Sequence, residues 1–304
     1  MFKVIEGEPF SAEISGIDIA RPDLALAEKL KALLTKHRVL VFRNVNLSPH
    51  DQVDFLGLFG HVATEAVGEA AKQDPTKLFG KVSFVTTKPN EYISGDQEIV
   101  FHADFSFYSD GPARVISLHA VEVDAEDPTI FADMGRAAQR MPKALLEKLR
   151  SLNLVKCSNH LVDNIWPSRM SNRSPDAFYG NTASIQPAVL RHPVSGEEVI
   201  NICQEFTSHV CGWSDAESDG LFAEVARFQY DAANLHRHRW RRGDLVVWDN
   251  FVLQHARESL TPGMTRHFQR VLVHPWDAEE LDQRTARAFA KSMSSARSRR
   301  RIAS

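Results

Sequence analysis

Two histidines and one aspartate have the residue types and spacing of a metal site. Residues 101–107 read FHADFSF, and in an extended segment His102 and Asp104 would point to the same face, about 7 Å apart. An isolated His-x-Asp triplet is more often a surface or core polar pair, so a third ligand is required. His255 provides one just after a strand-like apolar run. Two histidines and a carboxylate on one side of a metal, with the other side open, are typical of non-haem Fe(II) oxygenases.

Two arginines near the C-terminus could hold anions. Arg266 and Arg270 are separated by an even number of positions in a strand-like segment, so both guanidinium groups would face one side. Buried arginines are costly unless carboxylates pair with them. We therefore expect either acidic ligands at these residues or, as the alternative, carboxylates of the fold itself.

The other histidines have structural explanations. His236 and His238 share a strand face, but the arginines between residues 237 and 242 would repel a cation there. His119 lies in an apolar strand pattern, which predicts a hydrogen-bonded core residue. We do not expect a second metal site.

The composition is that of a globular protein without a polyanion partner. The chain has 304 residues, is 43% hydrophobic and 25% charged, and carries a formal net charge of −3. Its three cysteines, Cys157, Cys203 and Cys211, have no close C-x-x-C spacing, so neither a disulfide framework nor a zinc ribbon is indicated. The N-terminus lacks a signal-peptide pattern and no apolar stretch reaches membrane-spanning length. We expect a cytoplasmic protein that binds neither membrane nor nucleic acid.

Strand patterns outnumber helix patterns along the chain. Helices are expected from Asp23, Ser48, Asp133 and Ser214, the last with a capping box formed with Glu217. Long irregular stretches at residues 61–97 and 158–186 predict insertions, the first of them facing substrate. Residues 1–276 are expected to form a single domain, followed by a polar, basic tail at 277–304. Strands are expected at 2–5, 12–19, 39–42, 78–87, 114–123, 129–131, 240–250 and 267–274, with a hairpin around 193–196.

These elements predict a mostly β fold with flanking helices, built on a double-stranded β-helix (jelly roll) that can house an ion. The sequence then resembles the taurine dioxygenase (TauD/TfdA) family of Fe(II)/2-oxoglutarate-dependent dioxygenases. The likeness extends over roughly residues 1–276. It rests on His102-x-Asp104, a lone Thr129, Trp248-Asp249-Asn250 leading to His255, and the pair Arg266 and Arg270.

The resemblance implies a role for each matching residue. His102, Asp104 and His255 would bind iron. Arg266 would grip the C5 carboxylate of 2-oxoglutarate with help from Thr129. The residues implied near the C1 carboxylate or the substrate are Arg270, Phe107 and Phe206.

The implied activity is hydroxylation of a small carboxylate- or sulfonate-bearing molecule by O2, with release of succinate and CO2. Desaturation or isonitrile formation in natural-product biosynthesis would use the same cofactors, whereas Asp104 argues against halogenation. A catalytically silent jelly-roll binding module and a Zn²⁺-dependent hydrolase are alternatives of other classes. The family's taurine-specific His-x-x-Tyr arrangement has no clear counterpart in residues 61–97, so taurine itself is not expected. We also expect a homo-oligomer.

Overall fold

The computed structural model describes residues 2–64, 78, 80–87, 97–109, 111–124, 127–157, 183–261 and 263–274. Most of the insertion expected at 61–97, the part of the second insertion up to residue 182, and the tail at 277–304 lie outside the described residues. The chain divides into two compact units. The first contains residues 1–101, 113–133 and 232–278, and the second contains 102–112, 134–231 and 279–304. The single domain expected over residues 1–276 stays a prediction.

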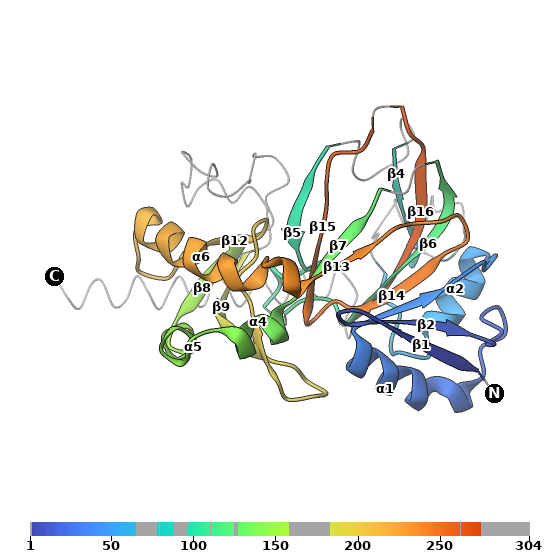
Figure 1. The fold of residues 1–304 in the computed structure, drawn as a ribbon, viewed down its shortest axis with the longest axis horizontal. Coiled ribbons are helices and arrows are strands. Elements are labelled where there is room, and N and C mark those ends of the chain that lie inside the picture. Colours follow the sequence, from blue (N-terminus) through green and yellow to red (C-terminus); the bar gives the residue numbers. More distant parts are fainter. Residues whose placement is uncertain are drawn as a thin grey trace. The chain divides into compact units, whose positions relative to one another are not determined.

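Two sheets make up the first unit (Figure 1). The strand pairs of the larger sheet are antiparallel except for β2 and β3, which run parallel. The larger sheet has the order β1 (Lys3–Gly7), β2 (Ser11–Ser15), β3 (Val39–Phe42), β14 (Leu245–Asp249), β6 (Val115–Val123), β16 (Arg266–Val273) and β4 (Ser83–Thr86). The smaller sheet has the order β13 (Leu235–His238), β7 (Thr129–Asp133), β15 (Leu253–Arg257) and β5 (Ile99–His102).

Helices α1 (Ala27–His37) and α2 (Pro49–Leu56) cover one face of the larger sheet (Figure 1). The run VLVF of β3 is buried at every position, as expected for a strand covered on both faces. The apolar core on the helix side is formed by residues that include Leu30, Leu34, Leu40, Phe42, Phe55, Leu56, Leu245, Val247, Val271 and Val273.

Side chains on the other face of the larger sheet meet the smaller sheet. Phe131 of β7 lies against Trp248 of β14, with their ring centroids 5.4 Å apart. His255 of β15 contacts the same indole, with the ring centroids 5.1 Å apart. Aromatic residues therefore fill the space between the sheets, next to the candidate metal ligand His255.

The second unit combines helices with short strands. It contains α4 (Met134–Arg140), α5 (Lys143–Arg150) and α6 (Asp215–Gln229), a sheet of the order β12 (Thr207–Val210), β8 (Asn153–Cys157) and β9 (Ala183–Pro187), and the hairpin β10 (Val189–Arg191) and β11 (Glu198–Ile200). The expected hairpin is confirmed. So is the capping box, because Ser214 Oγ accepts a hydrogen bond from the Glu217 amide while Glu217 Oε2 accepts one from the Ser214 amide, at 3.3 and 2.8 Å.

One expected helix start differs from the structure. Asp23 caps a 3-10 turn at Leu24–Leu26 instead of starting α1 directly. Asp133 directly precedes α4, as expected, but it is also the last residue of β7, where Arg38 Nε lies 3.6 Å from its carboxylate. The strand continues further than its apolar pattern indicated because Ala132 still pairs with β15 and β13, and Asp133 still pairs with β15.

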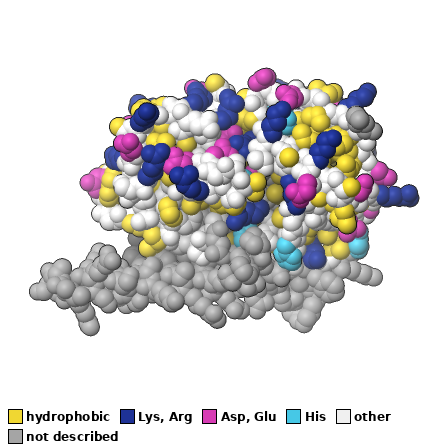
Figure 2. Space-filling view, turned by 90° about the horizontal axis from the view of Figure 1, so that it is seen from below, with side chains coloured by type: hydrophobic (Ala, Val, Ile, Leu, Met, Phe, Trp, Pro, Cys, Tyr) yellow, Lys and Arg dark blue, Asp and Glu magenta, His cyan; other side chains and the backbone are white. Residues whose placement is uncertain are grey.

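The mostly β character of the fold is confirmed. Within the described residues no helix is both long enough and apolar enough to cross a membrane. On the face shown in Figure 2, positive and negative side chains are interspersed without a broad area of one sign.

Candidate metal and anion site

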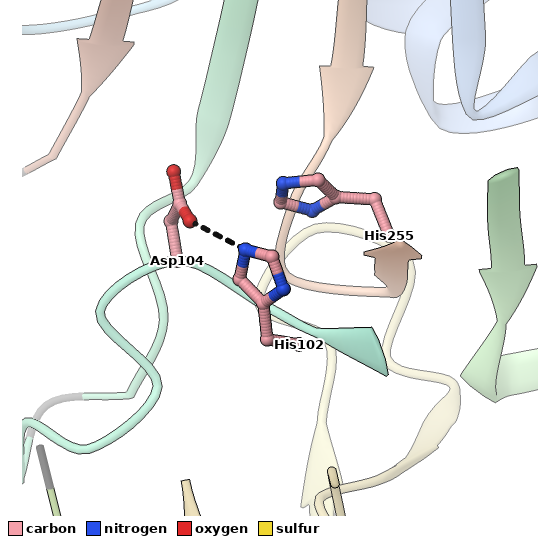
Figure 3. A group of neighbouring side chains, drawn as sticks. All are labelled: His102, Asp104 and His255. Atoms are coloured by element: carbon pink, nitrogen blue, oxygen red, sulfur yellow. Dashed lines mark ion pairs between the residues drawn. The ribbon is translucent and has the colours of Figure 1, made fainter. Parts of the chain in front are cut away.

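The three expected metal ligands lie together. The ligand atoms of His102, Asp104 and His255 are all within 4.8 Å of one another, and this is the one group of its kind among the described residues. Their side chains converge in Figure 3. His102 is the last residue of β5 and His255 lies in β15, the neighbouring strand of the same sheet. Strand pairing therefore brings the two imidazoles side by side.

Asp104 reaches the group by a different route from the one expected. The extended strand ends at His102, and the chain turns immediately afterwards, with Phe105 in a left-handed conformation at φ 62°. Asp104 Oδ1 consequently lies 3.3 Å from His102 Nε2, closer than two side chains of one strand face would be. A non-glycine residue in this conformation is uncommon and often marks a functional site.

A fourth side chain touches the group from outside. Glu205 Oε2 lies 3.2 Å from His102 Nδ1, while the other ring nitrogen faces Asp104. The distance is that of an ion pair, but the contact does not meet hydrogen-bond geometry. The sequence pattern alone gives Glu205 no role. The available sequence signal for Glu205 was its position directly before Phe206, an aromatic residue that the resemblance implies near the substrate.

Phe107 and Phe206, which the resemblance implies near the substrate, are neighbours. Their ring centroids are 5.0 Å apart, and Phe206 also meets His102 edge-on at 5.9 Å. Both phenyl groups are buried. They form an apolar wall beside the imidazole of His102.

Arg266 is a buried cation with no carboxylate within salt-bridge distance among the described residues, although the charge of Asp127 acts on it from farther away. Its Nη2 donates to Thr129 Oγ1 at 3.1 Å, its Nη1 contacts the Asp127 carbonyl at 3.5 Å, and its Nε has no hydrogen-bond partner in the described part of the chain. The guanidinium also lies over the ring of Phe268, 4.7 Å from its centroid. Burial, and secondarily the positive charge of Arg257, lower the pKa of Arg266 to about 9.

The hydrogen bonds of Thr129 determine which way its hydroxyl group can donate. Its Oγ1 accepts hydrogen bonds from Trp240 Nε1 at 2.9 Å and from Arg266 Nη2 at 3.1 Å. A hydroxyl has two acceptor positions and one proton to donate. With both acceptor positions filled, Thr129 can offer only its proton to a ligand beside Arg266.

Arg270 has different surroundings. Its Nε donates to Ser83 Oγ at 3.1 Å, and Ser83 is its direct partner on β4. Alternation along β16 places Arg266, Phe268 and Arg270 on one face. The expected common face of the two arginines therefore agrees with the strand.

His119, His236 and His238, for which the sequence offered structural explanations, contact groups of the fold itself. His119 is buried and its Nε2 lies 3.3 Å from the Val45 carbonyl. His236 Nδ1 contacts the Glu8 carbonyl at 3.1 Å, and His238 Nε2 contacts Asp244 Oδ2 at 3.1 Å. A carboxylate, that of Asp244, therefore lies beside His238. No third ligand from the described residues joins it.

Comparison with known proteins decides the family. The sequence profile described as "Taurine catabolism dioxygenase TauD, TfdA family" matches residues 3–272. The chain belongs to this family. The resemblance inferred from the metal-ligand spacing and the arginine pair is thereby confirmed.

Relatives of known activity use α-ketoglutarate, which is also called 2-oxoglutarate. The chain is 30% identical to a 2,4-dichlorophenoxyacetate dioxygenase of Cupriavidus pinatubonensis, covering 86% of this chain and 93% of the relative. It is 27% identical to a sulfate ester dioxygenase of Pseudomonas putida, covering 80% and 79%. Both are named as α-ketoglutarate-dependent. Pentalenolactone F synthase of Streptomyces avermitilis is 24% identical over 91% of this chain and 96% of its own.

Solved structures show the same fold. A taurine dioxygenase from Burkholderia xenovorans superposes with a TM-score of 0.70 at 19% identity, covering 90% of each chain. AAD-2 in complex with Mn(II) and N-oxalylglycine gives a TM-score of 0.70 at 20% identity, covering 90% of this chain and 97% of its own. The expected reaction class, an α-ketoglutarate-dependent dioxygenase with Fe(II), is confirmed at the level of the family and its relatives.

Proposed function

We propose that this protein oxidises a small acidic molecule, with Fe(II) held by His102, Asp104 and His255 and 2-oxoglutarate held by Arg266 and Thr129. The observation that carries the proposal is the convergence of two imidazoles and one carboxylate, together with a buried arginine that has no carboxylate within salt-bridge distance in the described part of the chain. The first group suits a divalent ion with open positions, and the second suits an organic anion.

The donor set passes a test of fit for iron. Two nitrogen ligands and one oxygen ligand gathered on one side leave the other side for exogenous ligands. The buried guanidinium of Arg266 would pair with the C5 carboxylate of 2-oxoglutarate, and this pairing offsets the cost of burying both charges. Bound together, Fe(II) and 2-oxoglutarate supply O2 activation coupled to decarboxylation to succinate and CO2.

The chain's own residues would bind and orient the reactants. Thr129 would donate its proton to the carboxylate that Arg266 holds, since Trp240 occupies one of its acceptor positions. Phe107 and Phe206 would hold the apolar body of the substrate beside His102. Arg270 would meet either the acidic group of the substrate or the C1 carboxylate of 2-oxoglutarate.

The substrate class is a carboxylate or sulfonate, and the outcome is hydroxylation. The relatives named for phenoxyacetate and sulfate ester substrates support an acidic substrate. The relative named pentalenolactone F synthase supports a second candidate function. In that function the same cofactors serve desaturation or another oxidation in natural-product biosynthesis. A silent binding module is disfavoured because all three ligand residues are present. The jelly-roll core, the cytoplasmic location and the homo-oligomer remain predictions.

The test is an anaerobic titration. Fe(II) and 2-oxoglutarate added to the wild-type protein should give a weak visible charge-transfer band, and exposure to O2 should release succinate. His255→Ala should lose the band, whereas His236→Ala, a histidine of the same sheet that contacts a backbone carbonyl, should keep it. An unchanged band in His255→Ala would refute the ligand assignment.

A further inference from the structure

Arg257 is a second buried arginine at the anion end of the site. It is the last residue of β15, two positions after His255, and its side chain is buried. Its Nη2 donates to the carbonyl of Gln97. Neither the sequence pattern nor the family resemblance gave this residue a role.

Strand register places Arg257 beside Thr129. His255 pairs with Phe131 and Ala256 pairs with Ile130, so the next step of the same antiparallel register sets Arg257 opposite Thr129. Directly opposed residues of neighbouring strands project from the same face, with Cβ atoms about 5 Å apart. Thr129 Oγ1 is also the atom to which Arg266 Nη2 donates. The side chains of Arg257 and Arg266 therefore approach Thr129 from two different strands.

The two guanidinium groups are close enough to influence each other. The positive charge of Arg257 is, after burial, the main cause that lowers the pKa of Arg266, and Asp127 opposes the shift. Two cations in a poorly solvated site repel each other unless an anion lies between them. A carboxylate placed there would be attracted by both.

The spacing along β15 matches a dicarboxylate that bridges the metal group and this pair. His255 and Arg257 face the same side, about 7 Å apart along the strand. A five-carbon 2-oxo dicarboxylate with its oxo-acid end at the metal group extends its other carboxylate over a comparable length. Arg257 and Arg266 would receive that second carboxylate.

We infer that Arg257 and Arg266 form a two-arginine pocket for the distal carboxylate of the 2-oxo acid. The inference rests on the proposed function, and it adds a binding residue at that site. Its consequence is strong discrimination between 2-oxo acids that carry a distal carboxylate and those that do not. Charge-assisted, bidentate contacts from two arginines are stronger and more directional than the contact of one.

The test compares two probes that differ only at the distal group, 2-oxoglutarate and 2-oxopentanoate. Their affinities for the Fe(II) protein are measured anaerobically by the charge-transfer band. Wild type should bind 2-oxoglutarate far more tightly. Arg257→Gln should weaken 2-oxoglutarate by about tenfold and leave 2-oxopentanoate unchanged, so that discrimination falls. Arg257→Lys should lie between the two proteins.

A matched control compares the loss of an arginine at this site with the loss of an arginine elsewhere on the same sheet. Arg237 lies in β13 with its side chain 52% exposed and pairs with Glu258, so Arg237→Gln should bind both probes as wild type does. Thermal unfolding of each variant monitors folding. If Arg257→Gln does not fold, the two affinities are measured on Arg257→Lys instead. Lysine keeps a positive charge beside the carbonyl of Gln97, so this variant disturbs the fold less.

Different results overturn different claims. If wild type does not distinguish the probes, the proposed role of the site in holding 2-oxoglutarate is wrong. If wild type distinguishes them and both Arg257 variants keep the full discrimination, Arg257 is not part of the pocket. If the Arg257 variants lose affinity for both probes equally, the residue acts only on the structure of the site, and the inference fails.

Discussion

His102 Nδ1 lies 3.2 Å from Glu205 Oε2, and His102 Nε2 lies 3.3 Å from Asp104 Oδ1. The imidazole thus stands between two carboxylates, one within the metal group and one outside it. An outer carboxylate that accepts the ring N–H of a ligand histidine fixes the orientation and tautomer of that ring and raises its basicity. We predict that Nε2, which faces Asp104, binds the metal and that Glu205 positions the ring through Nδ1.

The first prediction concerns this positioning. Glu205→Gln should weaken divalent metal affinity by about 10- to 100-fold, because the amide keeps the shape of the side chain but loses the charge that orients His102. Co(II) binding followed by its visible absorption measures the effect without turnover. Glu224→Gln, at an exposed position of α6, is the control and should bind Co(II) normally. Equal affinities for the two variants would show that Glu205 does not support the ligand.

How far the sequence alone predicts this site depends on the kind of signal. Two of the proposed ligands were predictable because His-x-Asp is a local pattern, and His255 was predictable because it follows an apolar strand. The turn at Phe105 was not predictable, since a left-handed phenylalanine has no clear sequence signal. The extended geometry assumed for Asp104 was therefore wrong, although its carboxylate does lie beside the two histidines.

The second unit was harder to predict. Lys156 is fully buried in β8, with its Nζ donating to the carbonyl and the side-chain oxygen of Asn201, both at 2.8 Å. Lysines are almost never fully buried, so the pattern gave no strand at residues 153–157. The partner of this strand, β9, begins at Ala183, and the intervening residues gave no periodic pattern. Arg257 and Glu205 were missed for a related reason, because their neighbours are set by strand register and tertiary packing.

The second prediction concerns Thr129. Thr129→Val keeps the shape of the side chain and leaves two donors, Trp240 Nε1 and one Arg266 N–H, without their acceptor. An unsatisfied buried donor costs about 1–3 kcal/mol, so the free energy of unfolding should fall by that order. The affinity for 2-oxoglutarate should fall as well. Thr129→Ser keeps the hydroxyl and should restore most of both properties.

Urea denaturation and anaerobic titration measure the two effects of Thr129→Val separately. A loss of stability with full 2-oxoglutarate affinity would mean that Thr129 only holds Trp240 and Arg266 in place. It would then have no contact with the ligand.

The third prediction is that Arg266→Lys raises the 2-oxoglutarate requirement by tens-fold. A lysine keeps the positive charge but cannot donate in parallel to both carboxylate oxygens while also reaching Thr129. The apparent 2-oxoglutarate constant from succinate release, together with the thermal unfolding midpoint, checks this. The midpoint should change little compared with the cofactor requirement. Unchanged cofactor affinity would exclude Arg266 as the anchor.

The fourth prediction concerns the substrate class and rests on Arg270. Its guanidinium shares a face of β16 with Arg266, and its Nε is held by Ser83 Oγ at 3.1 Å. If Arg270 meets the acidic group of the substrate, Arg270→Ala should weaken productive substrate binding by tens-fold or more, since losing a charge-assisted contact in such a pocket costs about 2–5 kcal/mol. Ser83→Ala removes only the side-chain support and should have a smaller effect in the same direction.

Titrating 2-oxoglutarate without substrate distinguishes the two roles of Arg270. If the residue binds substrate, Arg270→Ala keeps the charge-transfer band and its 2-oxoglutarate dependence, and uncoupled succinate formation survives. If the residue assists the C1 carboxylate instead, the variant loses cofactor affinity alongside Arg266→Ala. Full turnover of a carboxylate or sulfonate substrate by Arg270→Ala would contradict both roles, and the acidic-substrate assignment would have to be abandoned. Phe107 and Phe206 would then be left as the residues of the described chain that select the substrate, through its apolar body.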